Sequence, residues 1–194
     1  MTSLFLSASV PDTASDYYKQ CDPILIKAAL CSFLETVLGR KHIVFGGHPS
    51  ISGLMLAACE ETGTSKEALT IYQSSFFAGS IPEEFLQFAH FIATPAGSDL
   101  QTSLQIMRQR MLADHIYEAA VFIGGKEGIL EEHQHFTRLH PNAKVLALKS
   151  PGGAAALIEA PADTDDDELL DYIGVFATGL KINFRQKPTL IGSS

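Results

Sequence analysis

The sequence predicts an α/β fold in which a doubly wound, mostly parallel sheet carries helices on both faces, a Rossmann-like arrangement. Short apolar segments alternate along the chain with longer segments of helical periodicity, which is the pattern of a parallel sheet covered by helices. The apolar segments are continuous, as expected for strands buried on both sides. Glycines follow several of these segments, where a strand would turn into the next helix.

The first predicted strand covers residues 4–10 and is closed by Pro11. A helix is predicted over residues 23–38, where apolar residues follow the helical period, and Gly39 ends it. The second predicted strand, residues 42–45, follows directly. These three segments form the expected first strand–helix–strand unit.

Ser50 can cap a second helix that runs to Gly63. Residues 68–72 form a third predicted strand and residues 88–93 a fourth, whose position in the sheet the sequence leaves open.

The clearest helical pattern lies in residues 99–115. Its apolar residues recur at helical spacing and are Leu100, Leu104, Met107 and Met111.

A buried strand at 119–123 and a helix at 127–139 follow the pattern of the first half. A strand at 144–148 and a last helix at about 167–180 complete it. No repeat or linker interrupts the pattern, so residues 1–186 are expected to form one domain, with a flexible tail at 187–194.

The composition excludes several classes of protein. The chain has 194 residues, of which 46% are hydrophobic, enough for a sizeable core. Its net charge of -8 argues against broad contacts with nucleic acid, which need a basic surface. A small anion can still bind where loop amides and an arginine make a local positive site.

The cysteines and the N-terminus favour a cytoplasmic protein. Cys21, Cys31 and Cys59 are odd in number and none forms a CxxC pair, which suits a reducing compartment. The first residues lack the basic region of a signal peptide, and no apolar run reaches the roughly 20 residues that cross a bilayer.

Three loops are expected to meet at one edge of the sheet, because ligands of open α/β sheets bind outside the carboxyl ends of the strands. Glycine there lets the backbone approach a ligand, and helix N-termini offer amides to anions. The alternative is that these glycines only make tight turns. The candidate binding residues in these loops are Ser7, Ala8, Ser9, Gly46, Gly47, His48, Ser50, Gly124, Gly125, Lys126, Glu127 and Gly128.

Two arginines and two glutamates are further candidates. On a helical wheel, Arg108 and Arg110 border opposite sides of the apolar stripe, so one of them faces a single site, and Arg108 is favoured. Their alternative role is that of surface arginines. Glu132 lies nearer the apolar face of its helix than Glu131, although the helix dipole alone explains both.

A metal site and a bound cofactor are not expected. His133 and His135 diverge by about 200° on a helix, so one ion could not take both. Neither a GxSxG elbow nor a phosphate-binding P-loop is present.

The loops together resemble a known family. The segment from Phe122 to Glu132 is similar to the PGGxGTxxE signature of LOG-type Rossmann-like proteins of the SLOG superfamily, which also holds DprA-like domains. The similarity is closer to its sensor-type branch, including the ligand-binding domain of the Thoeris effector. There the segments 5–9, 46–51 and 122–128 have counterparts in the same order, as does a late loop with Gly152 and Gly153.

The resemblance implies two functions. Sensor branches bind a signal of the cyclic ADP-ribose type, whereas LOG enzymes hydrolyse the N-glycosidic bond of nucleoside 5'-monophosphates. In the enzyme, Glu132 would handle the ribose hydroxyls and Arg108 or Arg110 would be the catalytic arginine. Gly152 and Gly153 would join the ligand-binding loops.

The sequence departs from the LOG signature in three ways. Ile123 replaces its proline, Ile129 replaces its threonine, and either Lys126 or Glu127 is extra. Displacements of about 1 Å can cost on the order of 100-fold in rate, so these departures favour binding over LOG-type catalysis.

The expected partner is a nucleotide-like ligand such as ADP-ribose or cyclic ADP-ribose, which the protein would sense or sequester. Neither nucleic acid nor a membrane is an expected partner. A separate effector protein would complete a sensor, and the helix at 99–115 is apolar enough to pair subunits in a homo-oligomer.

Overall fold

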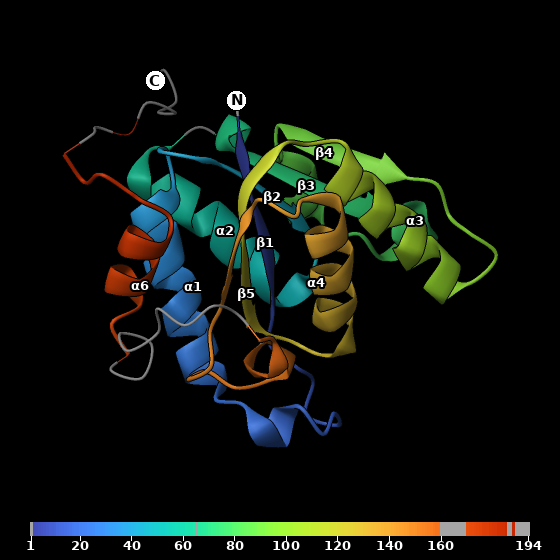
Figure 1. The fold of residues 1–194 in the computed structure, drawn as a ribbon. Coiled ribbons are helices and arrows are strands. Elements are labelled where there is room, and N and C mark those ends of the chain that lie inside the picture. The colour runs from blue at the N-terminus through green and yellow to red at the C-terminus, as the bar shows by residue number, and fades with distance from the viewer. Residues whose placement is uncertain (1, 65, 160–169, 186–187, 189–194) are drawn as a thin grey trace.

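A computed structural model describes residues 2–64, 66–159, 170–185 and 188. Six parallel strands form one sheet in the order β4-β3-β2-β1-β5-β6, with β1 near its centre (Figure 1). The strands are β1 (Ser3–Ser9), β2 (His42–Gly46), β3 (Leu69–Ser74), β4 (His90–Thr94), β5 (Tyr117–Gly124) and β6 (Lys144–Ala147). The predicted α/β fold with a parallel sheet is therefore confirmed.

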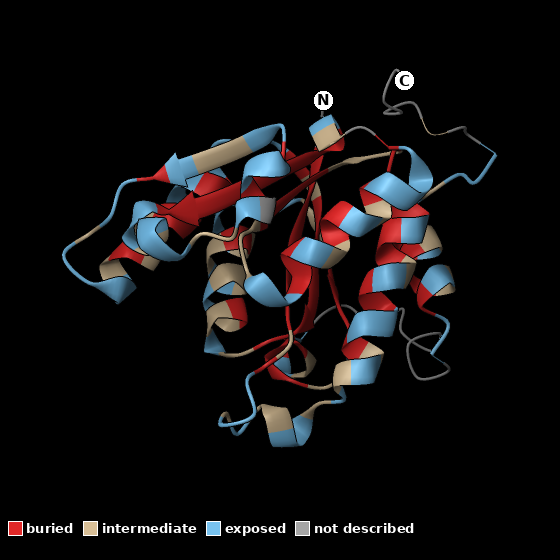
Figure 2. Cartoon of the chain, turned by 180° about the vertical axis from the view of Figure 1, so that it is seen from behind, coloured by how far each residue is buried: buried red, intermediate tan, exposed pale blue. Residues whose placement is uncertain are grey.

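Helices cover both faces of the sheet, which makes the fold doubly wound. The helices are α1 (Pro23–Val37), α2 (Pro49–Thr62), α3 (Leu100–Ala113), α4 (Glu127–Leu139) and α6 (Tyr172–Gly179). One core lies between the sheet and α1, α2 and α6, and a second lies between the sheet and α3 and α4. Figure 2 shows the buried strands enclosed between partly exposed helices.

The strand order reverses between β1 and β5. The chain builds β1 to β4 in one direction across the sheet and then returns to add β5 and β6 on the other side of β1. Ligands of doubly wound sheets bind at such a reversal, where two loops diverge from the carboxyl edge. The topology therefore favours a ligand site between the loops that follow β1 and β5.

Side-chain caps explain where the helices begin. Asp22 accepts hydrogen bonds from the amides of Ile24 and Leu25 at the start of α1. Asp99 accepts from the amide of Thr102 at the start of α3. Each carboxylate satisfies amides that have no partner within the helix.

The predicted cap of α2 at Ser50 is wrong. The N-cap is His48, whose Nδ1 accepts a hydrogen bond from the amide of Ser50 at 3.2 Å. Pro49 takes the first helical position, which suits proline because an amide there lacks an intrahelical partner. The helix therefore begins two residues earlier than expected.

Several predicted boundaries shift. The third strand begins at Leu69 and ends at Ser74, and the fourth begins at His90, because Phe88 caps the short 3-10 helix η4 (Glu83–Gln87) instead. β4 lies at the edge of the sheet.

The last helix begins at Tyr172, and residues 167–169 of its predicted span lie outside the described residues. The tail, apart from Pro188, also lies outside them, so one domain over 1–186 stays a prediction. In the described part of the chain, no helix is long and apolar enough to cross a membrane.

Gly153 joins the loop after β6 to the loop after β5. Its φ is +73°, and a Cβ at this position would lie 2.7 Å from the carbonyl carbon of Gly124. The amide of the next residue, Ala154, donates to the carbonyl of Gly125 at 3.0 Å. Two backbones therefore meet where a side chain has no room.

We expect Gly153→Ala to lower the free energy of unfolding by about 3 kcal/mol, because the left-handed conformation and the backbone clash both oppose a Cβ. Chemical denaturation measures the change. Gly53→Ala is the matched control, since a Cβ at Gly53 in α2 meets no atom within 4 Å, and alanine stabilises helix interiors by about 1 kcal/mol. Equal stability of the two variants would contradict the clash.

Candidate functional site

A cavity of about 520 Å³ opens at the carboxyl edge of the sheet, next to the reversal between β1 and β5. This volume lies within the range of small-molecule sites. The structure brings most of the predicted site residues together in its lining. Those that line it are Ser7, Ala8, Ser9, Gly46, Gly47, His48, Arg108, Lys126, Glu127, Gly128, Glu131 and Glu132.

A buried arginine forms the centre of the cavity lining. Arg108 comes from α3, and its side chain is only 9% exposed. Its Nε donates to Glu132 Oε1 at 3.2 Å, and its Nη1 contacts Glu131 Oε2. Ser7 Oγ, from β1, donates to the other Glu132 oxygen at 2.6 Å. Both Glu132 oxygens are thus held, so the carboxylate has a fixed position beside the cavity.

The two glutamates differ in exposure. The Glu132 side chain is 15% exposed, whereas that of Glu131 is 49% exposed. Solvent therefore screens the Glu131 contact far more than the Glu132 contact. Glu131 can exchange Arg108 for water at modest cost, while Glu132 stays fixed.

The N-terminus of α4 lies open to the cavity. Its N-cap residue, Lys126, makes no side-chain cap bond, and Glu127 and Gly128 of the first turn line the cavity. Gly128 also makes room for Arg108, because a Cβ there would lie 2.5 Å from Arg108 Nη2. Amides of a first helical turn with no side-chain cap favour an anion.

The loop after β2 is tied down by its own contacts. The Gly47 amide donates to the carbonyl of Tyr72 at 2.8 Å. Ser50 Oγ accepts from the Val10 amide at 3.2 Å and lies 2.7 Å from His48 Nδ1. Ser50 does not line the cavity. It fastens the end of β1 to α2 instead.

The surroundings of His48 favour its neutral form. Burial lowers the pKa of its imidazole below the ordinary value, and the nearby charge of Lys126 lowers it further. Nδ1 accepts the helix-capping bond from Ser50, so the proton of the neutral ring lies on Nε2. Protonation of Nδ1 would break the cap of α2.

The four glycines at 124, 125, 152 and 153 do not line the cavity. The Gly125 amide donates to the carbonyl of Ser9 at 2.8 Å, and Gly125 in turn accepts from Ala154. Gly152 packs against the backbone of Gln20 and Cys21. These glycines hold neighbouring loops together behind the cavity.

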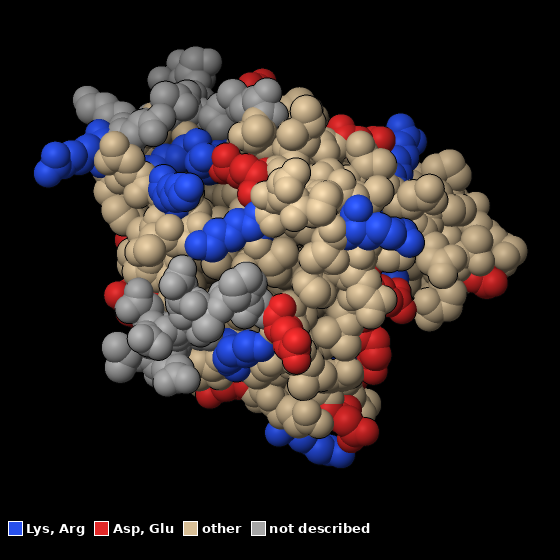
Figure 3. All heavy atoms as spheres, viewed as in Figure 1, with Lys and Arg blue, Asp and Glu red and all other residues tan. Residues whose placement is uncertain are grey.

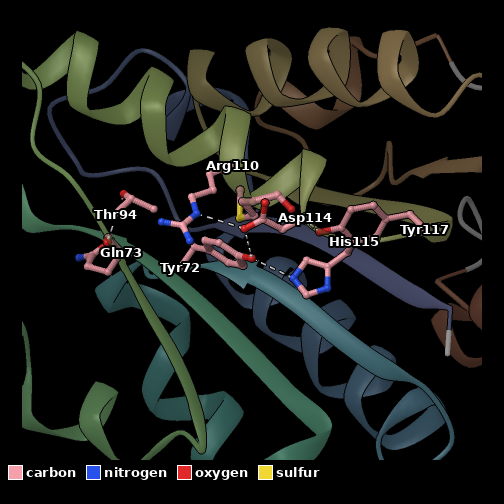
Figure 4. A network of polar contacts seen from close by, with 8 residues as sticks. Tyr72, Gln73, Thr94, Arg110, Asp114, His115 and Tyr117 are labelled. Carbon is pink, nitrogen blue, oxygen red and sulfur yellow. Dashed lines mark hydrogen bonds and ion pairs between the residues drawn. The ribbon is translucent and has the colours of Figure 1, made fainter.

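Arg110 does not line the cavity, and Figure 4 shows its side chain beside Asp114. Its Nε lies 3.2 Å from Asp114 Oδ2, which also accepts from the Tyr72 hydroxyl at 3.2 Å. The same hydroxyl lies 3.0 Å from His115 Nε2. Burial and the charge of Asp114 raise the pKa of Tyr72. Of the two candidate arginines, only Arg108 lines the cavity.

Sequence reasoning missed one side of the cavity. Gln73 lines it at the end of β3 and is only 6% exposed. A polar residue at the carboxyl end of an apolar strand was the signal that could have identified it. The lining residues outside the loop motifs also include Phe77, Ser80, Pro82, Leu100, Gln101, Leu104 and Met107, whereas Leu6, Pro49 and Ile129 belong to the motif segments.

An ion pair links two loops beside the cavity. Lys126 Nζ lies 2.7 Å from Asp12 Oδ2, and both side chains are well exposed. The hydrogen bond from Lys126 lowers the pKa of Asp12. An exposed pair of this kind is weak, so an incoming anion can take over Lys126.

The described residues contain no metal cluster, and the face in Figure 3 has no broad basic surface. No group of three or more His, Cys, Asp or Glu residues among them could hold a metal ion. On the face in Figure 3, the described basic and acidic side chains are interspersed. This face does not carry the extended basic patch that contacts to nucleic acid require.

The fold and the cavity place the chain among doubly wound α/β proteins with a candidate ligand site at the carboxyl edge of the sheet. The SLOG cluster3 family model matches residues 16–180, and the chain therefore belongs to the SLOG cluster3 family. The resemblance to the SLOG superfamily is confirmed. Family membership supports a role in binding or processing a nucleotide-related ligand.

The comparison with solved structures returns two matching chains. One is the X-ray structure of TM1055, a structural genomics target. It is 16% identical, with a TM-score of 0.48, and the match covers 80% of this chain and 78% of that chain. Among curated proteins, none matches.

The stability of the protein is expected to fall as the pH is lowered from 7 to 5. The pKa of His48 is lowered in the folded state, so the unfolded chain binds more protons near its ordinary value of about 6.5. His42, His115 and His133 act in the same direction. His48→Asn keeps a helix-capping acceptor but does not titrate, so its free energy of unfolding should depend less steeply on pH. Denaturant midpoints measured from pH 5 to 8 check this, and an unchanged slope would contradict it.

Proposed function

We propose that this protein binds a nucleotide-derived ligand of the ADP-ribose or cyclic ADP-ribose type and acts as a sensor or a sequestering module. The observation that carries the proposal is the Glu132 carboxylate, held by Ser7 and Arg108 beside an open helix N-terminus. A carboxylate with fixed oxygens suits a ribose diol, and the helix N-terminus suits a phosphate.

The two basic residues of the cavity lining, Arg108 and Lys126, are expected to have different roles because their charged neighbours differ. Arg108 already has two carboxylate partners, so it positions Glu132. A phosphate is drawn to the first turn of α4, where Lys126 can leave Asp12 to meet it. Glu131, the more exposed carboxylate, can turn into solvent and reduce the negative charge that a phosphate would meet.

The same carboxylate favours a second candidate function, an N-glycosidase of the LOG type acting on nucleoside monophosphates. The fixed Glu132 would stabilise positive charge that develops on the ribose as the glycosidic bond breaks. The inserted residue in the loop after β5 does not displace Glu132 from Arg108. The two candidates differ in the ligand and in whether it leaves intact.

Thermal shift and product chromatography on the same samples distinguish the candidates. We expect ADP-ribose or a cyclic isomer, at about 100 times its Kd, to stabilise the protein by about 2.7 kcal/mol. For a chain of this length, that raises Tm by about 5–10 °C. Nucleoside monophosphates and NAD complete the panel, and the ligand should be recovered intact.

Variants assign the effect to the cavity. Arg108→Ala should abolish the ligand-dependent shift, since Glu132 loses its positioning partner. Arg110→Ala, on the same helix but outside the cavity, should retain the shift. Free base that accumulates with time and disappears in Glu132→Gln would establish the glycosidase instead. Absence of both shift and product across the panel would refute both candidates.

A further inference from the structure

The cavity extends far beyond the Glu132 carboxylate. Ser7 and Glu132 lie by β1 and α4, whereas Gln73 lines the cavity at the end of β3. β3 is three strand positions from β5, which corresponds to about 14 Å across a sheet. A ligand anchored at Glu132 would therefore have a second part within reach of β3.

The β3 end of the cavity contains a buried amide. Gln73 is 6% exposed and lines the cavity. Its Oε1 lies just below Gly47, where a Cβ would be 3.2 Å from that oxygen and 2.7 Å from the ring of Phe85. The side-chain amide makes no hydrogen bond to the described residues, although the backbone carbonyl of Gln73 accepts one from Thr94. Because Gln73 lines the cavity, a ligand bound there can provide a hydrogen-bond partner for this amide.

Apolar side chains from separate elements line the same end. Phe77 belongs to the 3-10 helix η3 (Ser75–Ser80), Pro82 follows it, and Leu104 and Met107 come from α3. None of these four side chains is ionisable. Apolar side chains beside the Gln73 amide suit a flat heteroaromatic ring whose edge carries hydrogen-bonding groups.

We infer that the β3 end of the cavity holds the base of the ligand and that Gln73 selects among bases. The amide offers one donor and one acceptor, which match the amino group and ring nitrogen of adenine. Phe77 and Leu104 pack against the ring. This inference rests on the proposed function, since it assigns the base of the same nucleotide.

Calorimetric titrations test the assignment with three probes, which are ADP-ribose, its hypoxanthine counterpart, and ribose 5-phosphate, which has no base. Gln73→Met keeps the length of the side chain but removes both hydrogen bonds. It should weaken ADP-ribose binding about tenfold, bring the affinities for the two bases together, and leave ribose 5-phosphate binding unchanged.

A second variant tests the apolar wall. Phe77→Ala should weaken binding of both base-containing probes by about 5- to 100-fold, as loss of ring stacking does elsewhere. Ribose 5-phosphate binding should again be unchanged. The matched controls are Gln105→Met and Phe76→Ala, whose exposed side chains do not line the cavity. Both should bind as the unmodified protein does.

The outcomes separate this inference from the proposed function. If the unmodified protein binds ADP-ribose while Gln73→Met keeps its preference between bases, the base assignment is wrong and the function stands. Equal weakening of ribose 5-phosphate in both variants would mean that these residues only shape the cavity, which also overturns the assignment. If the unmodified protein binds none of the probes, both ideas fail.

Discussion

The burial of one positive charge organises the candidate site. Burying a guanidinium as deeply as that of Arg108 is energetically costly unless the charge has partners. Two glutamates of α4 are those partners. These contacts join α3 to α4, and Glu132 also accepts a hydrogen bond from Ser7 near the end of β1. The three elements that meet at the strand reversal therefore share one network, and Gly128 leaves space for it.

Most of the glycines in the loops make backbone contacts that stabilise the fold. Gly125 and Gly153 let the backbones of the loops after β5 and β6 come into contact. The Gly47 amide donates a hydrogen bond to the carbonyl of Tyr72. Amides used in this way are not available to a ligand. The first turn of α4 has no side-chain cap, and it lies beside the partly exposed charges of Lys126 and Glu131.

The cavity has two chemically different ends. Charged groups gather where β1, α3 and α4 meet, and a single amide with apolar neighbours lies at β3. The apolar end depends on the segment between β3 and β4, which is anchored by Phe85 and Phe88 in the core beside α2. A nucleotide has the same division, with phosphate and ribose at one end and a flat base at the other.

The sequence by itself determined the alternation of strands and helices, because burial on both faces leaves continuous apolar segments. Its loop motifs and the wheel position of Arg108 identified most of the cavity lining. Tertiary structure alone decided that His48 caps α2 in place of Ser50, that Gly152 and Gly153 lie behind the cavity, and that Gln73 lines it. These features depend on contacts between residues far apart in the chain, which periodicity and local spacing do not encode.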